Sequence, residues 1–139
     1  MTVSGRVDPI SFWTDGSPFS KANSRRIVKI GNTSRSIKSQ KALDFQREFQ
    51  RQCPKLDPLF QADLHIDLDI FYPDRRRDLD ESLVLDAMQG LVYANDRQIK
   101  SRRVRWNLSK ERPGILIGIR LCRPEDYAET STFPAEYSQ

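Results

Sequence analysis

The densest group of reactive side chains lies between residues 72 and 81, where three arginines precede two aspartates. Asp78 and Asp80 are separated by one residue, so in an extended backbone both carboxylates point to the same side. Carboxylate oxygens suit Mg²⁺ or Mn²⁺, and Mg²⁺ commonly shares its ligands with substrate phosphates. Arg75–Arg77 beside this pair favour a phosphodiester as the substrate. Asp96, further along the chain, is a candidate third carboxylate.

An Asp-x-Asp string also has a simpler structural interpretation. An aspartate just before a helix is often an N-cap or interacts with the helix dipole. Arginines next to aspartates often form surface ion pairs. The position of Asp78 and Asp80 after a predicted strand, next to a basic run, favours a metal site over this alternative.

Hydrophobic periodicity predicts the elements that position these residues. Residues 63–72 alternate strictly and form the clearest strand, and further strands are expected at 10–13, 26–30, 103–108 and 115–121. Helical spacing predicts helices at 39–53 and from Leu79 to about Gly90. The short Pro113-Gly114 turn suggests that the last two strands form an antiparallel pair. The class is α+β, with helices packed on a mixed sheet.

Length and composition indicate one domain and exclude several kinds of protein. The chain has 139 residues, and its 37% hydrophobic and 30% charged residues fit a globular domain at 1–123 with an acidic, flexible tail at 124–139. Cys53 and Cys122 form no CxxC pair, so a zinc site or a disulfide is not expected. His65 is the only histidine, which argues against a histidine-based nucleophilic triad. Without a signal sequence or an apolar span, a cytoplasmic protein is expected.

The basic residues are clustered in a way that predicts a polyanion partner. Residues 1–123 hold 23 bases and 15 acids, a net charge of +8. Residues 20–41 contain seven bases and no acid, and residues 97–112 contain seven bases and only Glu111. Such clusters are typical of nucleic-acid binding, although a solvated surface has the same appearance.

The stretch from Tyr72 to Ile99 resembles the core of the RusA family of Holliday-junction resolvases. In that family a strand leads to R-R-D-L-D-N, a helix with L-D-A-L follows, and a D-D-x-Q-I/V segment closes the site. The corresponding segments here are Asp-Arg-Arg-Arg-Asp-Leu-Asp at 74–80, Leu-Asp-Ala-Met at 85–88 and Asn-Asp-Arg-Gln-Ile at 95–99. This strong match covers about a fifth of the chain, and a weaker one extends over the remaining elements.

The resemblance implies a homodimeric, Mg²⁺-dependent enzyme, bacterial or phage-encoded, that nicks opposed strands of four-way DNA junctions; Mn²⁺ is an alternative metal. Asp78 and Asp80 match the family's paired metal ligands, and Asp96 matches the essential acid of the closing segment. The bases expected to hold DNA phosphates are Lys21, Arg25, Arg26, Lys29, Lys38, Lys41, Arg75, Arg76, Arg77, Arg97, Lys100, Arg102 and Arg103.

The chain also departs from the family pattern. Glu81 replaces an asparagine, and Val84 stands where the family usually has a lysine. The helix is also two residues shorter than the family's. The bases that we consider as replacements for this lysine are Lys38, Lys41, Arg97 and Lys100. Glu81 is interpreted as a solvated acid at a helix start, with an extra metal ligand as the alternative.

Other functions were weighed against this one. The runner-up is a non-catalytic relative that binds DNA junctions, motivated by Val84. A PD-(D/E)xK nuclease is disfavoured, because no (D/E)xK follows Asp74 at a useful distance. An RNA-binding module is disfavoured by the lack of aromatic repeats. Trp13, Phe19 or Trp106 could wedge into a junction, but packing is the expected role of each.

Overall fold

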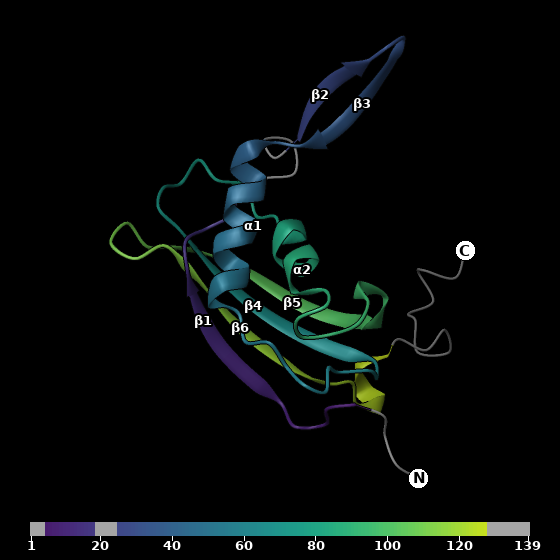
Figure 1. Ribbon diagram of the computed structural model, residues 1–139. Helices are drawn as coiled ribbons and strands as arrows, with labels where there is room; N and C mark the ends of the chain where they lie inside the picture. The colour runs from purple at the N-terminus through teal and green to yellow at the C-terminus, as the bar shows by residue number, and fades with distance from the viewer. Residues whose placement is uncertain (1–4, 19–24, 128–139) are drawn as a thin grey trace, which may run out of the picture.

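The computed structural model describes residues 5–18 and 25–127, and Figure 1 shows the arrangement of its elements. In chain order these are β1 (Ile10–Asp15), β2 (Arg25–Ile30), β3 (Thr33–Lys38), α1 (Gln40–Gln52), β4 (Leu64–Tyr72), α2 (Ser82–Met88), the 3-10 turn η1 (Asp96–Gln98), β5 (Ile99–Leu108), β6 (Gly114–Leu121) and η2 (Pro124–Asp126). In the described residues no helix is long and apolar enough to cross a membrane.

The main sheet has four strands in the order β1-β6-β4-β5. β4 lies inside this sheet, parallel to β5 and antiparallel to β6, while β1 pairs antiparallel with the other side of β6. Both helices cover one face of the sheet (Figure 1). The predicted α+β class with a mixed sheet is therefore confirmed.

The prediction that the last two strands pair with each other is wrong. β5 and β6 lie on opposite sides of β4, so the turn between them passes over the end of that strand. Alternation in the sequence shows that each strand has a buried face, but it does not identify the neighbour. β6 begins at a glycine for a steric reason: a Cβ on Gly114 would lie 2.1 Å from the Trp13 ring.

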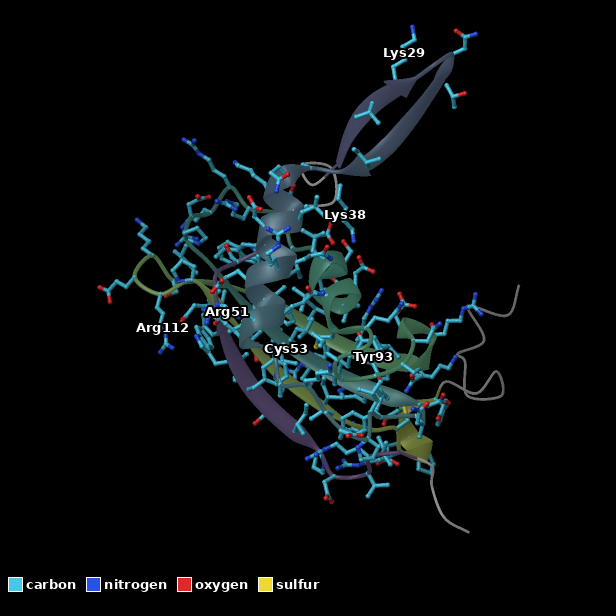
Figure 2. The ribbon with its side chains drawn as sticks, viewed as in Figure 1. Lys29, Lys38, Arg51, Cys53, Tyr93 and Arg112 are labelled. Atoms are coloured by element: carbon cyan, nitrogen blue, oxygen red, sulfur yellow. The ribbon has the colours of Figure 1, made fainter. Side chains whose placement is uncertain are left out.

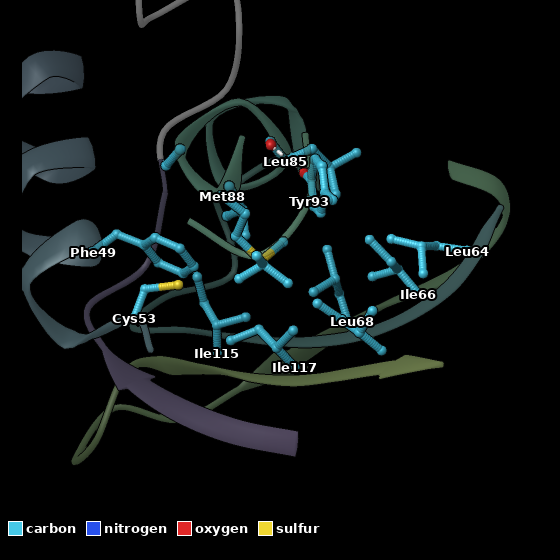
Figure 3. Close-up of a cluster of buried hydrophobic side chains, with 14 of the residues drawn as sticks. Phe49, Cys53, Leu64, Ile66, Leu68, Leu85, Met88, Tyr93, Ile115 and Ile117 are labelled. Carbon is cyan, nitrogen blue, oxygen red and sulfur yellow. Dashed lines mark hydrogen bonds between the residues drawn. The ribbon is translucent and has the colours of Figure 1, made fainter. Parts of the chain in front are cut away.

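The core lies between the helices and the helix-facing side of the sheet (Figure 3). The alternating residues Leu64, Ile66 and Leu68 of β4 are no more than 1% exposed, and Ile115 and Ile117 of β6 are fully buried beside them. On the helix side the same cluster contains Phe49, Cys53, Leu85, Met88 and Tyr93. Burying this apolar area is the main force that holds α1 and α2 on the sheet.

Helix α1 follows the sequence prediction closely. Ser39 caps it, its hydroxyl accepting a hydrogen bond from the Ala42 amide at 3.2 Å. Gln46 is buried on the packed side, and its amide donates to the Leu83 carbonyl at 3.0 Å and to the Asp86 carboxylate at 3.2 Å. Gln46 therefore links the two helices through a satisfied polar contact.

Helix α2 is shorter than predicted. Its first residue is Ser82, while Leu79, expected to begin the apolar stripe, precedes the helix and is 42% exposed. Gly90, with a φ of 88°, follows it in the left-handed conformation that glycine adopts readily. Residues 77–81, which carry the Asp-x-Asp pair, have no regular secondary structure.

Strands β2 and β3 form a separate two-stranded sheet that protrudes from the body of the molecule (Figure 1). The predicted strand at 26–30 is confirmed, whereas its partner Thr33–Lys38 was not predicted. Arg25 pairs in register with Lys38, and Ile30 with Thr33, around the turn at Gly31. Ile27 is 77% exposed, so this hairpin contributes little to the core.

The segment expected to form a flexible tail begins with an ordered turn. Arg120 of β6 binds Asp126 of η2, with 2.7 Å between Nη1 and Oδ2. The Tyr127 hydroxyl donates to the Asp63 carboxylate at 2.8 Å. Residues 124–127 therefore pack on the end of the sheet, and the rest of the expected tail lies outside the described residues.

Candidate active site

The segment that follows β4 turns back along the neighbouring edge strand. The Trp106 indole of β5 donates to the Arg77 carbonyl at 2.9 Å. Further back along β5, Arg102 lies 3.5 Å from Glu81. Residues 77–81 therefore run alongside β5 toward its N-terminal end and keep both aspartates at the edge of the sheet.

Asp80 is held at the point where this segment enters α2. Its backbone amide donates to the Tyr72 hydroxyl at 3.3 Å, and its Oδ1 accepts from the Ser82 amide at 2.9 Å and the Ser82 hydroxyl at 2.5 Å. One carboxylate oxygen of Asp80 therefore binds the helix start, as the simpler interpretation of Asp-x-Asp predicts. Asp78, by contrast, is exposed.

Tyr72 links the end of β4 to this acidic segment. Its ring stacks on Trp106 with centroids 5.8 Å apart. Burial raises the pKa of the Tyr72 hydroxyl, and the nearby charges of Asp80 and Glu81 raise it further. Tyr72 therefore stays protonated while its oxygen accepts the Asp80 amide.

The closing segment 94–98 is fixed mainly by Gln98. Its Oε1 accepts from the amides of Ala94 and Asn95 at 3.0 and 2.9 Å. Its Nε2 donates to the carbonyls of Phe60 and Ala62 at 2.9 and 3.0 Å. Asn95, which replaces the family's first aspartate, caps the turn by accepting from the Arg97 amide at 2.9 Å.

Asp96 lies near the C-terminal end of α2, whereas Asp80 precedes the start of that helix. It is exposed, and its amide donates to Gln89 Oε1 at 3.1 Å. Burial is the largest cause that raises the pKa of Tyr93, and the charges of Asp96 and Asp86 also raise it. Both acids therefore lie close enough to Tyr93 to act on its hydroxyl.

The three predicted metal ligands are not assembled into one cluster. In residues 5–18 and 25–127, no group of three or more His, Cys, Asp or Glu side chains is placed to hold a metal ion. The donor chemistry of Asp78 and Asp80 nevertheless fits a hard divalent cation, because both offer carboxylate oxygens on one segment. Mg²⁺ often takes only one or two carboxylates and completes its shell with water and substrate phosphates.

A family model described as endodeoxyribonuclease RusA matches residues 15–120, which is more than half of the chain. The protein belongs to the RusA family. No curated protein matches the chain closely enough to be named as a relative. Family membership indicates an endodeoxyribonuclease that acts on branched DNA junctions.

Val84, at the position of the RusA-family lysine, is fully buried in the core. It lies in the first half of the short helix α2, on the side that packs against the sheet. A lysine side chain in this position would enter the apolar cluster rather than reach the acidic segment. Val84 therefore packs in the core and does not face the acidic segment.

The bases considered as replacements for that lysine have different surroundings. Lys38, at the base of the hairpin, forms an ion pair with Asp86 of α2. Lys41 lies beside Asp44 and Glu48 in a surface cavity of about 330 Å³ at the start of α1. Arg97 and Lys100 are exposed, in η1 and at the start of β5 respectively.

The remaining bases predicted to bind DNA form more than one surface. Lys29 is exposed on the protruding hairpin, far from Lys38 at its base (Figure 2). Arg75 and Arg76 are exposed, and Arg77 lies 3.7 Å from Asp74. Arg25 and Arg26 belong to β2, and Lys21 lies outside the described residues.

Arg102 and Arg103 point to opposite faces of the sheet, because successive residues of a strand alternate. Arg102 is in register with the buried Ile66, and Arg103 with the exposed Asp67. Only Arg102 therefore lies on the face that carries the acidic segment.

Two residues of this site were not singled out by the sequence analysis. Gln98 was part of the family motif. Its hydrogen bonds to the carbonyls of residues 60 and 62 could not be predicted, because these residues are distant from it in sequence. Trp106 was expected to pack, and it does so while also holding the Arg77 carbonyl. Trp13 likewise packs, with its ring 5.5 Å from that of Phe71, and Phe19 lies outside the described residues.

Proposed function

We propose that this RusA-family protein resolves four-way DNA junctions by paired, Mg²⁺-dependent phosphodiester hydrolysis in DNA recombination and repair, with Mn²⁺ as an alternative metal. The observation that carries this proposal is the RusA match over residues 15–120, which includes all three acidic positions. The exposed, arginine-flanked segment at the edge of the sheet supports it.

Asp78, Asp80 and Asp96 would hold the metal ion or ions. A divalent cation in such a site polarises the scissile phosphate and lowers the pKa of the attacking water. The hydroxyls of Ser82 and Tyr72 orient Asp80, since Ser82 donates to its carboxylate and Tyr72 accepts from its backbone amide. Asp96 would supply the third carboxylate from the capped turn near the C-terminal end of α2.

The exposed guanidinium groups of Arg75 and Arg76 would hold phosphates next to the cut. Arginine presents several N–H donors in a planar fork, which matches the oxygens of a phosphate. The bases of the hairpin, including Lys29, would bind a junction arm further from the chemistry. Contacts to phosphates position the DNA and carry little sequence information.

A homodimer would supply the two cuts. A four-way junction has near two-fold symmetry, so a C₂ dimer places two identical sites against opposed strands. Light scattering of the free protein and of its junction complex should give the mass of two chains. A monomer in both states would contradict the dimer and require two independent binding events.

The direct test is incubation with an end-labelled four-way junction in Mg²⁺, Mn²⁺ or EDTA, with linear duplex of the same sequence as the control. The proposal predicts paired nicks in opposed strands of the junction only, and only with metal. Equal cutting of the linear duplex would contradict junction resolution.

The second candidate is a protein that binds junctions without cutting them. It is favoured by the buried Val84 and by the lack of a preassembled three-carboxylate cluster in the described residues. The same assay separates the two functions. Tight junction binding with no nick in either metal would favour the binding protein.

A further inference from the structure

A surface cavity of about 290 Å³ lies along the first half of β5. It is lined by Ile99, Lys100, Ser101 and Arg102. Both bases therefore line the same cavity, although the register shift opposite Leu64 and His65 leaves Lys100 without a partner residue on β4. Arg102 lies on the face that carries the acidic segment, because it is in register with the buried Ile66.

Arg102 is held at the acidic segment by an ion pair. Its Nε lies 3.5 Å from Glu81 Oε1, and the two side chains are 54% and 20% exposed. Glu81 directly follows Asp80, so the guanidinium lies next to the proposed metal-binding pair. A guanidinium has five N–H donors, and one carboxylate oxygen uses only part of them. The pair therefore leaves Arg102 able to bind a second, anionic group.

The charge of this cavity suits one class of ligand. Of the four residues that line the cavity, Lys100 and Arg102 are positively charged and none is acidic. The nearby charge of Glu81 is paired with Arg102. Arg97, two residues before the cavity, is exposed and adds to the positive potential. A phosphodiester oxygen pair is the anion that the proposed substrate brings to this edge.

We propose that Lys100 and Arg102 form a phosphate-binding subsite that holds a DNA phosphate next to the scissile one. This inference rests on the proposed function, since it places a DNA strand along the acidic segment. It differs from a general basic surface in one respect: Arg105, on the same strand, lies on the opposite face beside Asp69 and is predicted to contribute nothing. Arg105 is therefore the matched control.

The first experiment measures binding to a fluorescent four-way junction in EDTA, where no cleavage occurs. Lys100→Ala and Arg102→Ala should each weaken binding about tenfold and lower the slope of log affinity against log salt by about 1, as expected for one lost phosphate contact. Arg105→Ala should stay within about twofold of the wild type. Arg102→Lys should fall between wild type and alanine, because lysine keeps the charge but loses the fork.

The second experiment locates the phosphate. Single neutral methylphosphonates are placed in turn along the strand that would be cut. At one position the wild type should lose as much affinity as Arg102→Ala, and Arg102→Ala should lose nothing more there, because the two changes remove the same contact. Additive losses at every position would overturn the subsite.

The outcomes also separate this inference from the proposed function. A wild type that does not bind the junction overturns both. A wild type that binds it, with Arg102→Ala and Arg105→Ala equally affected, overturns the subsite alone. Thermal unfolding of the variants by circular dichroism should match the wild type, since both arginines are exposed.

Discussion

On the outer face of the sheet, the charged residues of neighbouring strands neutralise one another. Asp69 of β4 binds Arg105 of β5, with 2.8 Å between Oδ1 and Nε. His65 lies between Ser101 and Asp67, at 2.8 and 3.1 Å. These contacts are in or near register across the strands, so this face is stabilised by its own pairs.

On the helix-facing side, the acidic residues do not belong to the strands. They lie on the segment that returns along β5, where Asp78 is exposed and Glu81 meets Arg102 at 3.5 Å. Positive residues on this side stand along the same edge, on β5 and in the arginine run. The comparison shows that the number of charges on a strand says little about function. We propose that the segment beside the strand determines which of the strand's charged residues contact DNA.

The largest expected effect is on cleavage. Asp78→Asn, Asp80→Asn and Asp96→Asn should each lower junction cleavage about 100-fold or more, because asparagine keeps the shape but loses the charge that attracts the metal. Asp69→Asn, on the outer face, should stay within about twofold. Single-turnover rates at saturating protein make the comparison. Equal losses of cleavage rate for Asp69→Asn and Asp80→Asn would contradict the claim that only the helix-facing side takes part in cleavage.

The next effect concerns the closing segment that carries Asp96. Gln98→Ala should lower the free energy of unfolding by about 1–3 kcal/mol, because it leaves polar groups on both sides without partners. Gln89→Ala, which removes a single contact to the Asp96 amide, should cost less than about 1 kcal/mol. Urea denaturation of both variants measures the difference. Similar losses would show that Gln98 is not the main clamp.

A smaller effect is expected at Trp106 and Trp13, which lie on opposite faces of the main sheet. Trp106→Phe removes the hydrogen bond to the Arg77 carbonyl and should release the arginine run, while Trp13→Phe removes a bond to Asp15 on the outer side. Each change should cost about 1 kcal/mol. Limited trypsin digestion should cut faster at Arg75–Arg77 only in Trp106→Phe. Unchanged digestion there would mean that other contacts hold the returning segment.

The smallest effect is on stability at high pH. Burial raises the pKa of Cys53 from about 9 to about 12, so the folded state favours the neutral thiol. Above pH 9 the unfolded chain releases this proton first, and stability should fall between pH 9 and 12. Cys53→Ala should flatten the fall in unfolding temperature between pH 9 and 10, before tyrosines ionise. An identical pH dependence would show that Cys53 does not contribute.

The sequence predicted the elements better than their arrangement. Alternation from Leu64 to Tyr72 identifies β4, and the spacing of Ala42 and Phe49 identifies α1, because each pattern reports a buried face of that element alone. The second hairpin strand, Thr33–Lys38, was missed because it buries no face and so lacks such a pattern.

The sequence did not predict which strands lie next to one another, and the reason is physical. Whether β6 pairs with β5 or with β4 depends on packing across the sheet. The candidate aspartates were found from their types and motif, but their surroundings depend on distant contacts. The return of residues 77–81 along β5 requires Trp106, and the burial of Val84 follows from where α2 begins.

The central claim is that the returning segment, and not the outer face, binds the metal. Mn²⁺ titration followed by electron paramagnetic resonance tests this without requiring cleavage. Wild type and Asp67→Asn/Asp69→Asn should deplete free Mn²⁺ equally in the presence of junction DNA. Asp78→Asn/Asp80→Asn should deplete free Mn²⁺ no more than the DNA alone does, since the phosphates of DNA also bind some metal. Equal depletion by both double variants would contradict the account.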